Sequence, residues 1–143
     1  MNHFKYWLDL ALWLAGIGHF CILFASFQVP GRLGWKQDLA QLTPFNRKLM
    51  WVYAGTTLMT IIAFGTLTLL LHQEYLAGDR AAVGLAAFIA VFWTIRILVD
   101  FIYFEHSDWP AGTQFVVGHI LLTCLFVALA FTNWMVVVWS FVK

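Results

Sequence analysis

The chain has 143 residues, of which 62% are hydrophobic and only 10% charged, and its formal net charge is +1. A soluble domain is about a quarter charged and about half apolar, so this composition is typical of a protein whose solvent is lipid. The near-neutral charge excludes the basic surface of a nucleic-acid-binding protein. No linker or low-complexity tract interrupts the chain, which predicts a single transmembrane domain over residues 1–143.

Four apolar stretches are long enough to cross a bilayer, which takes about 20 mainly apolar residues. In chain order, the predicted helices cover residues 6–27, 47–71, 81–104 and 113–138. The first connection is the longest and carries helix breakers at Pro30-Gly31 and Thr43-Pro44, whereas the other two are short. Short connections make consecutive helices antiparallel neighbours. The sequence therefore predicts an all-α membrane protein, an antiparallel four-transmembrane-helix bundle.

Basic residues favour one orientation of this bundle. The first connection and its flanks hold four of them, whereas the opposite face has three. The four at the first connection are Arg32, Lys36, Arg47 and Lys48. The three at the opposite face are Lys5, Arg80 and Lys143. By the positive-inside rule, the first and third connections lie in the cytoplasm and both termini lie outside.

Two charged residues, Arg96 and Asp100, lie inside the third predicted helix. Charge at bilayer depth costs roughly 2.5–3.5 kcal/mol per residue on insertion scales, so such residues are functional candidates. The spacing of four residues also lets them neutralise each other, with Arg96 extending towards the interface. Alternatively, the planar guanidinium presents donors to a carboxylate, a phosphate head group or a quinone carbonyl. A contact with a partner subunit is a third interpretation.

Antiparallel packing brings one polar residue from each helix to a common depth below the same membrane face. At 1.5 Å per residue, the depth is about 12 Å for His19, about 10 Å for Tyr53, about 12 Å for Arg96 and about 9 Å for His119. This convergence predicts a polar intramembrane pocket. Its candidate ligand-binding residues are His19, Tyr53, Arg96, Asp100 and His119.

The two histidines at matching depth, His19 and His119, suggest a further hypothesis. An up-down bundle places its first and last helices side by side, so two neutral imidazoles could bind the iron of a haem b. The chain has no C-x-x-C-H attachment motif, and a hydrogen-bonded core histidine is the simpler interpretation of each. The turn with Glu105, His106 and Asp108 lacks metal-ligand spacing and is interpreted as a solvated loop.

Two segments carry a resemblance to known proteins. The first is the run from Thr43 to Gly55 together with Ala63-Phe64-Gly65, and the second is Phe92 to Asp108 with Trp93, Arg96 and Tyr103-Phe104. They resemble a family of small, uncharacterised bacterial four-helix integral membrane proteins. The resemblance covers about half of the chain and implies a four-span fold in the bacterial inner membrane, which together with the charge rule above puts the termini in the periplasm. It implies no activity, and it does not include His19 or His119.

Three functions follow as hypotheses. In the first, the chain is a bundle that binds a membrane lipid, a quinone or a similar amphiphile. In the second, it is an accessory subunit of a membrane complex, and bis-histidine haem binding is a variant of this role. Its partners in either case include another membrane subunit or further copies of the chain. The third hypothesis is a membrane-embedded enzyme, in which Arg96 stabilises developing negative charge and His19 or His119 serves as the acid–base group. No nucleophile elbow, phosphate-binding loop or zinc-protease motif occurs in the sequence, so none points to a reaction.

Overall fold

The computed structural model describes residues 2–104 and 112–142 and confirms the predicted all-α fold with four long antiparallel helices. These are α1 (Asn2–Arg32), α3 (Pro44–Leu70), α5 (Arg80–Tyr103) and α6 (Thr113–Val142). Two short helices, α2 (Trp35–Asp38) and α4 (His72–Ala77), and a 3-10 turn at Leu39–Gln41 lie in the connections. The turn with Glu105, His106 and Asp108 lies outside the described residues.

The first helix is longer than predicted and passes through Pro30, where a break was expected. Proline removes one helical N–H donor and crowds the turn before it, and α1 ends within a turn after Pro30. The chain leaves the helix only after Arg32 and turns at Gly34, whose φ of 68° is easily reached by glycine. The breaker in this connection is therefore the glycine and not the proline.

A capped turn joins α4 to α5. Gly78 adopts a φ of 63° at the end of α4, and Asp79 then caps α5. The Asp79 Oδ1 atom accepts hydrogen bonds from the backbone N–H groups of Ala81 at 2.9 Å and Ala82 at 3.2 Å. Such a cap satisfies donors that a helix start leaves free, so this Gly-Asp pair defines the turn between the second and third spans.

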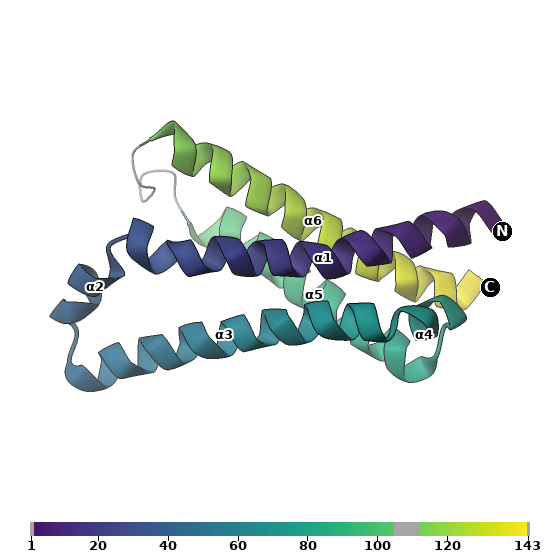
Figure 1. Ribbon diagram of the computed structural model, residues 1–143, viewed down its shortest axis with the longest axis horizontal. Helices are drawn as coiled ribbons and strands as arrows, with labels where there is room; N and C mark the ends of the chain where they lie inside the picture. The colour runs from purple at the N-terminus through teal and green to yellow at the C-terminus, as the bar shows by residue number, and fades with distance from the viewer. Residues whose placement is uncertain (1, 105–111, 143) are drawn as a thin grey trace.

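The helices pack in the spatial order α3, α1, α6 and α5, so the first and last spans are neighbours as predicted. Figure 1 shows that α3 and α6 are far apart at the end with α2. At the end with both termini, α4 contacts α6, where Trp139 Nε1 donates to the carbonyl oxygen of Leu76 at 3.2 Å. The positions of the buried residues fit this asymmetry, since they lie in the half of each helix nearer the termini. In α3 they lie between Ile61 and Thr68, and in α6 between Phe126 and Trp139. The bundle is thus tightly packed at one end and splayed at the other.

Close approach of α1 and α3 depends on two glycines. A Cβ atom at Gly65 would lie 3.0 Å from the Cβ of His19 and 3.3 Å from the carbonyl oxygen of Gly16. A Cβ atom at Gly16 would overlap the Leu69 side chain. Small residues let membrane helices approach closely, so this contact holds α3 against the rest of the bundle.

Candidate functional site

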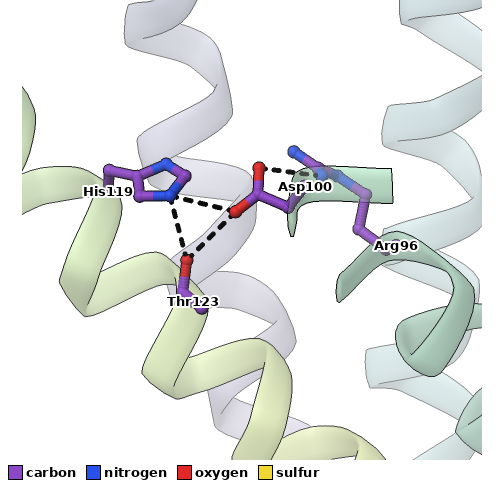
Figure 2. A network of polar contacts seen from close by, with 4 residues as sticks. All are labelled: Arg96, Asp100, His119 and Thr123. Carbon is purple, nitrogen blue, oxygen red and sulfur yellow. Dashed lines mark hydrogen bonds and ion pairs between the residues drawn. The ribbon is translucent and has the colours of Figure 1, made fainter. Parts of the chain in front are cut away.

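The side chain of Asp100 is the centre of a polar network between α5 and α6 (Figure 2). The Arg96 Nη1 atom lies 3.3 Å from Asp100 Oδ1, and the His119 Nε2 atom lies 3.0 Å from Asp100 Oδ2. The Thr123 hydroxyl donates to Asp100 Oδ2 at 3.3 Å. Both carboxylate oxygens therefore have partners, which a buried carboxylate requires in an apolar environment.

Helical spacing places these groups. Arg96 and Asp100 share one face of α5 at a spacing of four residues, and His119 and Thr123 do the same on α6. The two faces meet because α5 and α6 pack against each other along their length. The guanidinium also lies over the ring of Phe126, with its Cζ atom 5.3 Å from the ring centre, which adds a cation–π contact.

Exposure differs sharply among the three ionisable side chains. The Asp100 side chain is 5% exposed, whereas those of Arg96 and His119 are 39% and 31% exposed. The carboxylate is therefore enclosed, and the two nitrogen-bearing groups extend from it towards the surface of the splayed end. This arrangement can hold a guanidinium and an imidazole in fixed positions beside the bilayer.

His19 lies deeper and contacts a different set of groups. Its Nδ1 atom donates to the carbonyl oxygen of Ala15 at 2.7 Å, and its Nε2 atom accepts from Trp93 Nε1 at 3.1 Å. Both ring nitrogens are thus engaged, so His19 does not fit an iron ligand unless the Trp93 contact breaks. The Trp93 ring stacks on Phe126 at 4.8 Å, and Phe126 in turn contacts Arg96, so among the described residues aromatic rings connect His19 to the network.

Tyr53 does not join these residues. Its side chain is 58% exposed on the splayed half of α3, and its carbonyl oxygen accepts hydrogen bonds from Thr56 and Thr57. Of the five candidate residues, the structure brings together Arg96, Asp100 and His119. Depth along the helix was a correct guide for His119, but depth does not determine which way a side chain points.

A second ion pair, which sequence reasoning missed, lies at the opposite end of the bundle. The His72 Nε2 atom of α4 lies 2.8 Å from Asp9 Oδ1 of α1. The sequence does point to this residue, because Asp9 is an acidic residue within the first predicted helix, where a charge needs a partner. Two hollows in the described surface also lie near this end, one beside Asp9 and one between the first turns of α1 and the second half of α6.

Comparison with known proteins identifies no relative: no family model, no curated protein and no solved structure matches this chain. The class of protein therefore rests on the fold. All four long helices are long and apolar enough to cross a membrane, with mean hydropathies from 1.5 to 2.3. The chain is a small integral membrane protein with four candidate spans and an Arg-Asp-His network between the last two.

Proposed function

We propose that this membrane protein binds the polar end of a lipid, a quinone or a similar amphiphile at Arg96. The observation that carries the proposal is the contrast between an enclosed Asp100 carboxylate and a guanidinium that is 39% exposed beside it. A purely structural ion pair has no need to keep its cation at the surface of the bundle. Here the carboxylate contacts Arg96 through Nη1 (Figure 2), and the rest of the guanidinium is free to meet a ligand at the surface of the bundle.

The chemistry of the network favours a ligand with an oxygen acceptor. A guanidinium has five N–H donors, and among the described residues Asp100 accepts from only one of its nitrogens, Nη1. Because Asp100 balances the charge of Arg96, a neutral carbonyl can bind there as well as a phosphate. The helices α3 and α6 diverge at this end (Figure 1), and the apolar part of such a ligand would lie in the bilayer beside the partly exposed Arg96.

The experiment is to identify what the purified protein retains. The protein is extracted in a mild detergent, and lipids and quinones are quantified by mass spectrometry for the wild type, Arg96→Leu and Arg80→Leu. Arg80 is an exposed arginine at the other end of α5, so it controls for the loss of a positive charge. We expect Arg96→Leu to lose one compound that Arg80→Leu retains. An identical set of compounds in all three proteins would contradict the proposal.

A partner within the membrane is a second candidate role, favoured by the exposed half of α3. No residue from 44 to 60 is buried in the structure, although the helix is long and apolar. We propose that this half of α3 contacts a second copy of the chain or another membrane subunit. Oxidative cross-linking of a Thr57→Cys variant, with Cys21 and Cys124 replaced by serine, tests the first case, and absence of a cross-linked dimer would exclude it.

The bacterial inner membrane is the proposed location, with both termini in the periplasm. The orientation is supported by the basic residues at the α2 end, where Arg32 ends α1 and Lys36 lies in α2, and the location by the resemblance alone. Fusions of an alkaline phosphatase and of a fluorescent protein to the C-terminus test the orientation. We expect phosphatase activity and no fluorescence, and the reverse result would invert the orientation.

A further inference from the structure

The ion pair between Asp9 and His72 organises the packed end of the bundle. His72 is buried, its Nε2 atom lies 2.8 Å from Asp9 Oδ1, and its Nδ1 atom lies 3.3 Å from Gln73 Nε2. The ring of Trp13 covers the imidazole at 4.9 Å. These contacts hold α4 against α1 at the end opposite to Arg96.

A hollow of about 400 Å³ lies beside this pair. Its lining residues come from the first turns of α1 and from α4, and all but one carry a polar or charged group. They are Lys5, Tyr6, Asp9, Gln73 and Leu76. The hollow is open to the surface and not enclosed, so it suits a polar group that lies at the protein surface.

Opposite charges stand apart on the rim of this hollow. Lys5 and Asp9 are four residues apart on α1, a spacing at which they could form an ion pair. Within residues 2–104 and 112–142, however, the ion pair of Asp9 is made with His72. The Asp9 side chain remains 40% exposed and Lys5 is exposed as well. A hollow lined by both an ammonium and a carboxylate is complementary to a zwitterion.

The position of the hollow corresponds to the lipid head groups. The span in α1 has 30 residues and is therefore about 45 Å long, whereas the hydrocarbon core is about 30 Å thick. The ends of α1 must extend into the interface. Tyr6 and Trp7 are exposed in these first turns, and such aromatic residues favour that region. On the other wall, α4 begins after the second candidate span has ended.

We propose that this hollow binds the phosphoethanolamine head group of a membrane lipid. The phosphate lies against the ammonium of Lys5 and the hydroxyl of Tyr6. The primary ammonium of the head group donates to the exposed Asp9 carboxylate and to the side-chain carbonyl of Gln73. A choline head group has no N–H to donate, and an anionic glycerol head group brings no cation to Asp9, so these two acceptors select the primary amine.

Native mass spectrometry in a mixture of equal amounts of phosphatidylethanolamine, phosphatidylcholine and phosphatidylglycerol tests the proposal. We expect phosphatidylethanolamine to be the main lipid retained. Lys5→Gln should reduce the retained amount about fivefold, as expected for one partly exposed charge contact, while Lys36→Gln at the other end should not. Asp9→Asn should remove the preference over phosphatidylcholine. Because Lys5 is exposed, its replacement should leave the fold intact.

Two outcomes would overturn the proposal. Equal retention of the three lipids by the wild type would exclude a head-group site, and so would wild-type retention in Lys5→Gln together with unchanged selectivity in Asp9→Asn. Binding of soluble glycerophosphoethanolamine without any lipid preference would assign the hollow to a soluble ligand instead. Arg96→Leu should leave the preference for phosphatidylethanolamine unchanged, so this proposal and the proposed function can fail independently.

Discussion

At the scale of single residues, Asp100 determines the geometry of the candidate site. It accepts contacts from Arg96, His119 and Thr123, and it is the least exposed of these four side chains. Removing one partner of a buried ion pair leaves the other uncompensated, which is more costly than replacing both. The carboxylate is therefore the residue whose loss should be most harmful.

We expect Asp100→Asn to lower the free energy of unfolding by about 1–3 kcal/mol, less than for a fully buried pair because Arg96 is partly exposed. The Arg96→Gln/Asp100→Asn double variant should be more stable than the sum of the two single changes implies. Denaturant unfolding in detergent measures all three variants. Strictly additive losses would show that the two side chains do not interact.

The buried hydrogen bond between Trp93 and His19 is a second interaction of single residues that should stabilise the fold. Trp93→Phe leaves the Nε2 atom of a fully buried histidine without its donor, which should cost about 1–3 kcal/mol. The matched control is Trp134→Phe, since Trp134 donates to Thr94 at an exposed position. We expect a much smaller loss there, and equal losses in the two variants would refute a special role for the buried bond.

Part of the candidate site could be predicted from the sequence. Arg96 and Asp100 were identifiable because charge in a membrane helix is costly, and His119 because it lies at a matching depth. The orientation of a residue about its helix axis could not be predicted, since the neighbours of α3 determine which face is buried. For that reason Tyr53 was expected in the pocket and lies on the exposed surface instead.

At the scale of the helices, the contact between α1 and α3 depends on Gly65. A methyl group there would lie 3.0 Å from the Cβ of His19, so Gly65→Ala forces the helices apart. Overpacking of this kind costs typically about 1–3 kcal/mol. Thermal unfolding in detergent should show the loss.

Gly55→Ala is the control for this change on the same helix. No atom outside its own helix lies within 4 Å of a Cβ built at Gly55, so the added methyl group meets open space. Alanine is also the better helix former by about 1 kcal/mol. We expect this variant to be as stable as the wild type or more so. If both glycine variants lose the same stability, close helix contact is not the cause.

The short helix α4 carries a tyrosine that titrates late. Burial raises the pKa of Tyr75 to about 12, an effect that Thr68 partly opposes. Because the folded pKa exceeds the ordinary value of 10.0, the unfolded state loses its proton first. The stability that Tyr75 contributes is therefore complete below pH 10 and is lost as the pH rises to about 12.

Absorbance of tyrosinate at alkaline pH measures this effect. The difference between the titrations of the wild type and Tyr75→Phe should show a tyrosine that ionises near pH 12 in the folded protein. Ionisation of Tyr75 near pH 10 would contradict its burial between α1 and the end of α6.

The helix boundaries show what hydropathy can and cannot supply. The predicted starts and ends of α3 and α5 agree with the structure within a few residues, because polar residues flank both apolar runs. The helix α1 extends beyond its predicted range at both ends, and α6 extends beyond its predicted range at its C-terminal end. Apolarity detects the part of a helix that lies in lipid, whereas these helices continue into the interface, where amphipathic and aromatic residues replace apolar ones.

At the scale of the whole molecule, the bundle has two unlike ends. The end with the termini is packed and holds the Asp9–His72 pair, whereas the end with α2 is splayed and holds the Arg96 network (Figure 1). The sequence predicted four antiparallel helices but not this asymmetry, which arises from where the small residues of α1 and α3 allow contact. Under the proposed function, an amphiphile would meet Arg96 at the splayed end.

Binding at Arg96 is the central claim, and the bound fraction measures it most directly. Native mass spectrometry of the wild type, extracted from its own membranes, should show a bound small molecule in addition to bulk lipid. Arg96→Leu should reduce that bound fraction about tenfold or more, the loss for a charge-assisted contact of roughly 1.5 kcal/mol or more, with Arg80→Leu unchanged. A folded Arg96→Leu protein with the bound fraction of the wild type would contradict the account.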